Sequence, residues 1–343
     1  MTTNDVASQA QETTSTAGSP ATSMSVGRFV RDRWNILAPF VVLVLLLIGF
    51  SIVSPLFFTP ENLFNILRSS AVLMVVALGT TVVVLTGGID LSVGSTLTLS
   101  AYVGAMLANT TQSGNALIVV PLIGLACGLL NGLLVSYARL PSFLVTLGGY
   151  FAYDGIAGYI SNGQPITLRS GGIGDWFQGS PGGVPALSIW AIAVLVVVVL
   201  LFRYTRLGRY IFAVGGNERT AKLVGVPASR VKFLAFAISG LLAGFAALMQ
   251  VVRTQSASAG MGSPFLLLAI GAVVMGGTAL SGGIGGPLYS MLGVLVISIL
   301  SNGMVLGNVN PYLQNVILGS VVVAAVAVTK IQSRARDRNE VVK

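Results

Sequence analysis

The chain has 343 residues, of which 54% are apolar and only 8% charged, with 42 glycines and a mean hydropathy of +0.87. A soluble globular domain carries roughly 25% charged residues, so this composition excludes a water-soluble enzyme and indicates a membrane protein. The lack of histidine excludes His-ligated metals, His-based catalytic triads and imidazole proton relays. The single cysteine, Cys127, excludes a disulfide framework or a thiolate cluster, and we expect a small core residue there.

Residues 1–30 are expected to form a disordered cytoplasmic tail, because the first 27 are mostly Ser, Thr, Ala, Gln and Gly with no apolar stretch. Crossing about 30 Å of hydrocarbon takes about 20 apolar residues of helix. Ten segments approach that length, so the sequence predicts an all-α, polytopic membrane protein with about ten transmembrane helices. The segments are 36–54, 63–86, 92–109, 116–137, 142–161, 185–202, 231–252, 264–280, 286–306 and 311–329.

The fifth segment, 142–161, is weakened by four glycines and Asp154. Lys and Arg are retained on the cytoplasmic side of short loops, which gives a second criterion. With ten spans and an internal N-terminus, 16 of the 19 cations lie on the cytoplasmic side, and only Arg68, Arg169 and Arg253 do not. Omitting the fifth span would move the seven cations of 203–232 outside. We therefore expect it to cross, with both termini cytoplasmic, and the net charge of +9 reflects topology rather than nucleic-acid binding.

The loop 203–232 carries more cations than orientation requires, so we expect a partner to bind there. Asn217 is a good N-cap, Glu218 favours a first turn, Gly225 suits the residue after a helix end, and Pro227 forbids continuation. These signals predict a two-turn helix over 218–224, followed by Ser229 as the cap of the next membrane helix. A helix this short is stable only when held against protein. The alternative is a solvated linker whose cations only enforce topology.

Several motifs carry a family resemblance. Leu-Thr-Gly-Gly-Ile-Asp-Leu-Ser-Val-Gly-Ser at 85–95 resembles the signature of the ribose/xylose-type sugar permeases. Further matches are Leu-Asn-Gly-Leu-Leu-Val at 130–135, Leu-Pro-Ser-Phe-Leu-Val-Thr-Leu-Gly at 140–148, Ala-Val-Gly-Gly-Asn-Glu at 213–218 and Gly-Gly-Thr-Ala-Leu-Ser-Gly-Gly at 276–283, in family order. The loop resembles the coupling loop of ATP-binding-cassette (ABC) importer permeases, Glu-Ala-Ala-x-x-x-Gly. Here Ala221 and Gly225 are kept, but Arg219 and Thr220 replace the leading Glu-Ala.

The resemblance implies a permease subunit with a type II ABC importer-like fold in the bacterial inner membrane. It would pair with a second permease subunit, expected to be identical, rest on cytoplasmic ABC ATPase subunits and receive a sugar from an extracytoplasmic binding protein. The permease domain would cover 31–330, with a basic cytoplasmic tail at 331–343. No Gly-x-x-x-x-Gly-Lys-Ser/Thr motif occurs, so no ATPase, catalytic, cofactor or metal site is expected. The expected coupling residues are Asn217, Glu218, Arg219, Thr220, Ala221, Lys222 and Gly225.

The glycine-rich motif around Asp90 should face protein or a water-filled cavity, because lipid leaves irregular backbone unsatisfied. Asp90 has two possible roles: a cap for the third span, accepting amides near Ser92 and Val93, or a ligand for sugar hydroxyls. The glycine-rich turn 276–286 is either a second part of the path or a site of close helix packing. Amides in the spans, Gln250 among them, suit a neutral monosaccharide or interhelical hydrogen bonds. The path candidates are Gly87, Gly88, Asp90, Ser92, Ser95, Asn131 and Asn302.

Two other classes remain open from the sequence. An ion-coupled secondary transporter needs intramembrane carboxylates, for which Asp90 and Asp154 are the acidic candidates. An intramembrane aspartyl protease is mimicked by short motifs at Tyr153–Asp154, 172–175 and 185–187. Such an enzyme needs two facing carboxylates on separate spans, whereas Asp175 is expected in an outer loop over 162–184, and about 35 residues are too few for three helices.

Overall fold

The computed structural model describes residues 34–168 and 171–341, with side chains over 38–168 and 171–327, so the predicted tail at 1–30 lies outside it. The described residues from Asn35 onward form one compact unit. The helices are α2 (Trp34–Val53), α3 (Pro60–Leu85), α4 (Val93–Thr110), α5 (Val119–Ser136), α6 (Ser142–Ser161), α7 (Ala186–Tyr204), α8 (Arg206–Gly216), α9 (Glu218–Leu223), α10 (Ala228–Thr254), α11 (Ser263–Met275), α12 (Pro287–Leu306) and α13 (Pro311–Val341). Short 3-10 helices are η1 (Gly114–Ile118), η2 (Gly172–Phe177) and η3 (Pro181–Gly183), and β1 (Ile166–Thr167) pairs antiparallel with β2 (Ser256–Ala257).

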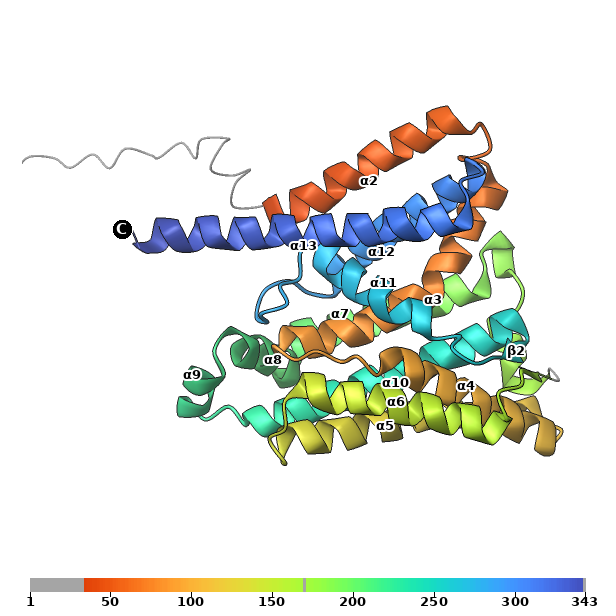
Figure 1. The fold of residues 1–343 in the computed structure, drawn as a ribbon, viewed down its shortest axis with the longest axis horizontal. Helices are drawn as coiled ribbons and strands as arrows, with labels where there is room; N and C mark the ends of the chain where they lie inside the picture. Colours follow the sequence, from red (N-terminus) through yellow and green to blue (C-terminus); the bar gives the residue numbers. More distant parts are fainter. Residues whose placement is uncertain (1–33, 169–170, 342–343) are drawn as a thin grey trace, which may run out of the picture. The chain divides into compact units, whose positions relative to one another are not determined.

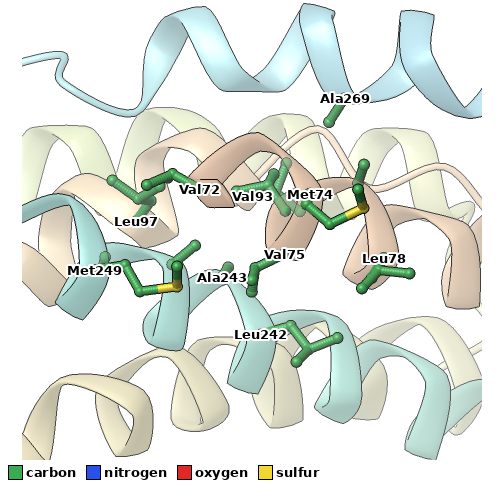
Figure 2. Close-up of a cluster of buried hydrophobic side chains, with 14 of the residues drawn as sticks. Val72, Met74, Val75, Leu78, Val93, Leu97, Leu242, Ala243, Met249 and Ala269 are labelled. Carbon is green, nitrogen blue, oxygen red and sulfur yellow. The ribbon is translucent and has the colours of Figure 1, made fainter. Parts of the chain in front are cut away.

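Helix α3 is the centre of the fold. Every residue from Ser70 to Leu85 is buried, which fits a helix that is apolar on all sides. It packs against α7, α8, α10, α11 and α12. Figure 2 shows its Val72 and Val75 among side chains of α4, α10 and α11, including Leu97, Met249 and Ala269. Elements far apart in the sequence therefore share one hydrophobic core.

Glycines allow α5 and α10 to cross at close range. A Cβ added at Gly124 or at Gly240 would lie 2.3 Å from the backbone oxygen of the other residue. Gly128 is equally tight, because its Cβ would lie 2.4 Å from the oxygen of Phe236. Membrane helices associate through such small residues. The glycine content of these two helices therefore has a packing role.

A helix occupies each of the ten predicted segments, in agreement with the polytopic all-α expectation. Within the described residues, α3, η1–α5, α7, α10 and α12 are long and apolar enough to cross a membrane by length and composition. The stretches Ala38–Val53, Ser263–Met275 and Pro311–Ala327 are apolar but shorter. Helix α4 carries more polar residues than these, and its residues 93–102 are all buried, so this part of α4 need not face lipid.

The eighth predicted segment, 264–280, is wrong at its C-terminal end, because α11 stops at Met275. Gly277 has φ +100°, and the amides of Gly277 and Thr278 close the helix on the carbonyls of Val274 and Val273. The 13 residues of α11 extend about 20 Å, which is less than the hydrocarbon thickness. The glycine-rich turn after it thus begins within the length expected for a span.

The two ends of the helix bundle differ. Helices α8 and α9 lie at one end, on the left in Figure 1, where the C-terminal part of α13 also ends. The strands β1 and β2 lie at the opposite end. Helix α13 continues to Val341, so the residues expected as a basic tail extend a helix at least that far.

The crossing of α5 and α10 predicts that Gly240→Ala destabilises the protein. The new Cβ would lie 2.3 Å from the Gly124 oxygen and 2.6 Å from the Gly128 Cα, and such overpacking costs about 1–3 kcal/mol. Thermal unfolding of the purified protein in detergent measures the effect. Gly148→Ala on α6 is the matched control, since nothing lies within 4 Å of its Cβ, and equal melting temperatures for the two variants would refute the close crossing.

Candidate functional site

The junction between α3 and α4 is built around the carboxylate of Asp90, which is only 2% exposed. Its Oδ1 accepts hydrogen bonds from the Ser92 amide at 3.0 Å and the Ser92 hydroxyl at 2.7 Å, while Oδ2 accepts one from the Ser239 hydroxyl at 3.0 Å. Asp90 thus orders the first residues before α4 and ties them to α10. The Val93 amide is not among its donors, and Ser92 holds the N-cap position. This geometry favours the structural role for Asp90 over the ligand role.

The hydrogen-bond network continues from Ser92 into two more helices. Asn131 on α5 donates to the Ser92 hydroxyl at 2.8 Å, and Tyr153 on α6 donates to the Asn131 side-chain oxygen at 2.9 Å. The peptide of Ile89 also contacts α6, through the hydroxyls of Ser142 and Thr146. Buried polar groups of this kind specify one arrangement when all are satisfied. Four helices are thereby joined at one buried polar centre.

The other path candidates are distributed unevenly. Gly87 and Gly88 lie just before Asp90, and Gly87 has a positive φ of +78°. The Ser95 hydroxyl donates a hydrogen bond to the Ser92 carbonyl at the start of α4. Asn302 lies elsewhere: its amide exchanges two hydrogen bonds with Asn62, at 2.8 and 3.0 Å, and so joins α12 to α3. The structure therefore brings together all the path candidates except Asn302.

The second glycine-rich turn, 276–286, meets the first one directly. The Gly283 amide donates to the Leu85 carbonyl at 3.1 Å, at the C-terminal end of α3. A Cβ at Gly215, near the end of α8, would lie 1.8 Å from that same oxygen and 2.6 Å from the Gly283 nitrogen. The backbones at Leu85, Gly215 and Gly283, which are far apart in the sequence, are therefore in van der Waals contact. Position 215 must be glycine, because a side chain there would prevent this approach.

Helix α9 is a capped two-turn helix over Glu218–Leu223, one residue shorter than predicted. The Asn217 Oδ1 accepts a hydrogen bond from the Thr220 amide at 2.9 Å. At the other end Gly225 has φ +82°, and the amides of Gly225 and Val226 bond to the carbonyls of Lys222 and Ala221. Both ends therefore have the capping that the sequence pattern indicates.

Charges fix α9 to the start of α10. The Glu218 carboxylate forms two ion pairs. Within α9 its Oε1 lies 2.7 Å from the Lys222 Nζ, and its Oε2 pairs with the Lys232 Nζ of α10. The hydrogen bonds from Lys222 and Lys232 hold the pKa of the Glu218 carboxyl below its ordinary value, so that it is ionised at neutral pH. With the Ala221 side chain also buried, one face of α9 is held on the protein.

The opposite side of α9 is open. Leu223 and Val224 are 83% and 74% exposed, and Arg219 and Thr220 are exposed next to them. A cavity of about 520 Å³ separates α9 from the glycine motif. Its lining includes residues of the glycine motif, of α9, of the α5–α6 connection and of α10, namely Gly87, Gly88, Glu218, Lys222, Arg139 and Lys232. The expected coupling residues on α9 and the path candidates of the glycine motif are therefore neighbours.

The sequence reasoning missed α8, and it misplaced the cap of α10. The missed signal was periodicity: Leu207, Tyr210, Ile211 and Val214 recur at i, i+3, i+4 and i+7 after the N-cap Thr205, whose hydroxyl accepts the Gly208 amide. The Ser229 prediction is wrong, because α10 begins at Ala228 and no side chain caps it. Pro227 itself holds the N-cap position, and its side chain has no atom that can accept a hydrogen bond from the helix amides.

The Asp90 centre predicts strong energetic coupling between Asp90 and Ser239. In a double-mutant cycle of Asp90→Ala and Ser239→Ala, measured by denaturant unfolding in detergent, we expect a coupling energy of about 1–3 kcal/mol, because either single change leaves a buried group unpaired. A parallel cycle of Asp90→Ala with Asn302→Ala should be additive. If the Ser239 cycle were also additive while uptake of the solute was lost, Asp90 would act on the solute instead.

Comparison with known proteins places the chain in a family. Residues 62–326 match the family model described as "Branched-chain amino acid transport system / permease component". The chain is 36% identical to the ribose import permease protein of Escherichia coli (strain K12), over 89% of this chain and 97% of that protein. It is 37% identical to the ribose import permease protein of Bacillus subtilis (strain 168), over 87% and 93%, and 33% identical to the D-allose transport system permease protein of E. coli (strain K12), over 88% and 93%. No solved structure matches the chain.

These relatives also decide against the aspartyl protease considered from the sequence. They are named as permease proteins of import and transport systems, not as proteases, and Asp175 lies in the 3-10 helix η2 rather than on a membrane helix facing Asp154. The chain therefore belongs to the permease component family of branched-chain amino acid transport systems, as a sugar-type ABC transporter permease subunit that spans the bacterial inner membrane and is not itself an enzyme.

Proposed function

We propose that this subunit translocates a neutral monosaccharide, delivered by an extracytoplasmic binding protein and driven by partner ABC ATPase subunits. The cargo class is inferred from the relatives, because two are named for ribose and one for D-allose, which are uncharged sugars. It agrees with the buried polar groups near Asp90, which are mainly amides and hydroxyls. We further propose a homodimer with both termini cytoplasmic.

The observation that carries the proposal is the form of α9. Large apolar side chains exposed to water need a cover, and Leu223 and Val224 are exposed at the tip of a short helix. The basic residues in the loops around this tip favour a cytoplasmic position, where no lipid would cover it. The helix is nevertheless fixed by its caps and by Lys232. A rigid helix with an exposed apolar tip fits a docking element for a cytoplasmic protein.

Movement of α9 would reach the membrane part by two routes. The ion pair of Glu218 with Lys232 connects α9 to α10, which also carries Ser239 of the Asp90 centre. Helix α8, directly before α9, contacts both glycine-rich turns through Gly215. When ATP closes the ATPase subunits, a push on α9 would therefore shift the helix ends around these turns. The binding protein would dock on the outer loops 162–184 and 253–263.

Gly225 provides the test of the docking role. Gly225→Val should abolish ATP-driven uptake, because a β-branched residue at φ +82° is strained by about 1–3 kcal/mol and distorts the end of α9. No atom lies within 4 Å of a Cβ at this position, so the change creates no clash elsewhere. Uptake of labelled D-ribose and D-allose is measured in proteoliposomes that contain the permease, its ATPase subunits and its binding protein.

Gly225→Asn is the matched control, because asparagine tolerates positive φ and should retain uptake. Both variants should reach the membrane in normal amounts. If Gly225→Val transported as fast as Gly225→Asn, the shape of α9 would not matter and its docking role would be refuted.

A further inference from the structure

The cavity between α9 and the glycine motif is enclosed by elements from four parts of the chain. Its lining comes from residues 86–88 after α3, from residues within 135–142 around the α5–α6 connection, from α9 and from the N-terminal part of α10. Its volume of about 520 Å³ falls within the roughly 300–1,000 Å³ that is typical of small-molecule sites. The cavity is therefore large enough to hold a ligand, and the chemistry of its lining indicates which kind.

Positive charge exceeds negative charge in this lining. The cations are Arg139, Lys222 and Lys232, and the carboxylate is that of Glu218, so the lining has three positive charges against one negative charge. Both lysines share the Glu218 carboxylate, whereas Arg139 has no ion pair or hydrogen bond among the described residues. A concave surface lined by one sign of charge concentrates ligands of the opposite sign. The cavity thus favours an anion with more than one negative charge.

A buried hydrogen-bond donor in the lining also lacks a partner. The Ser136 side chain is only 5% exposed, and its hydroxyl has no hydrogen-bond partner among the described residues. A buried hydroxyl without a partner is destabilising and is rare in native structures. A hydrogen-bond acceptor bound in the cavity would supply the partner that the protein does not provide.

Two helices begin at the wall of the cavity without a side-chain cap. Helix α6 follows Pro141 and α10 follows Pro227, and neither proline accepts a hydrogen bond from the first turn. Ser142 and Ser229, which belong to those first turns, line the cavity. The first amides of a helix carry a partial positive charge and favour anions. The helix starts therefore add to the attraction that the cationic side chains exert.

We propose that this cavity binds a phosphate group through Arg139, Lys222 and Ser136. An arginine guanidinium matches two phosphate oxygens at once, a lysine ammonium acts as a point charge, and a serine hydroxyl donates one hydrogen bond. A phosphate monoester carries about −1.5 to −2 charges at neutral pH, which balances the excess positive charge of the lining. Two sources have this chemistry: a soluble phosphate compound and the headgroup of a phospholipid.

A bound phosphate restrains α9, and this effect on transport rests on the proposed function. Lys222 belongs to α9, whereas Arg139 lies in the connection between α5 and α6. One ligand that contacts both residues ties α9 to two of the helices that meet at the Asp90 centre. Since transport requires α9 to move, phosphate in the cavity lowers the uptake rate.

Binding of radiolabelled inorganic phosphate to the purified full-length chain in detergent tests the site without any transport. Arg139→Asn removes the guanidinium and suits the positive φ of +57° at this position, so it should weaken binding about tenfold or more. Ser136→Ala should weaken binding about fivefold and should not lower the melting temperature of the phosphate-free protein, because the hydroxyl has no partner there. Arg209→Gln is the matched control, exposed on α8 outside the lining, and should bind like the wild type.

Equal phosphate affinity of the wild type, Arg139→Asn and Ser136→Ala would overturn the site. Absence of phosphate binding, with fewer ATPase subunits copurifying with Arg139→Asn than with the wild type, would overturn it as well. In that case the cations would serve an acidic surface of the ATPase.

Vesicles of defined composition distinguish the two sources of phosphate. If the ligand is a soluble compound, the chain in phosphatidylcholine vesicles should bind inorganic phosphate as it does in detergent, and added phosphatidylglycerol should not change the affinity. If the ligand is a lipid headgroup, phosphatidylglycerol should compete with inorganic phosphate. Either result supports the site and identifies its source.

Uptake by the complete complex tests the restraint on α9. In proteoliposomes with the permease, its ATPase subunits and its binding protein, inorganic phosphate is added on the ATPase side at its measured dissociation constant. Wild-type sugar uptake should fall about twofold, because half of the sites are then occupied, and uptake by Arg139→Asn should fall much less. Product inhibition of the ATPase would affect both equally, so equal sensitivity would refute the restraint. If the wild type imports neither D-ribose nor D-allose, the proposed cargo is wrong, whereas the binding measurements still decide the phosphate site.

Discussion

Irregular backbone inside a membrane is stable only when its amides and carbonyls find partners in the protein, and this constraint governs the centre of the fold. The chain leaves helical geometry after α3 and again after α11, in both places at glycines. The first break is stabilised by Asp90, which fixes the start of α4 and accepts Ser239 from α10. The second is joined to the first by the hydrogen bond from Gly283 to Leu85. Each break depends on contacts from elements remote in the sequence.

The same contacts connect the end of the bundle that carries α8 and α9 to its core. Because Gly215 has no side chain, α8 reaches the backbone of both breaks, and α9 follows α8 after a single residue. The Lys232 ion pair holds α9 on α10 as well. A force on α9 therefore acts on points where helices end rather than on the middle of a continuous helix. Helix ends at glycines are the places where a small rotation disturbs the fewest backbone hydrogen bonds.

The sequence predicted the parts of this arrangement that depend on local chemistry. The spans follow from apolar length, and α9 follows from Asn217 and Gly225, whose effects act over one or two turns. It did not predict Ser239 as a partner of Asp90, since one serine in a long apolar helix has no local signal. The end of α11 was misjudged because Ala279 and Leu280 extend the apolar run beyond the glycines that stop the helix. Helix α8 did have a signal, its 3.6-residue periodicity, which the high charge of the loop obscured.

The central claim is that the permease has no energy source of its own and moves because another protein acts on α9. Proteoliposomes containing the purified subunit alone, compared with vesicles that also contain the ATPase subunits and binding protein, test it most directly. The account predicts that labelled sugar accumulates above the outside concentration only in the complete vesicles with ATP, whatever ion gradient is imposed. Accumulation by the subunit alone, driven by a proton or sodium gradient, would contradict it.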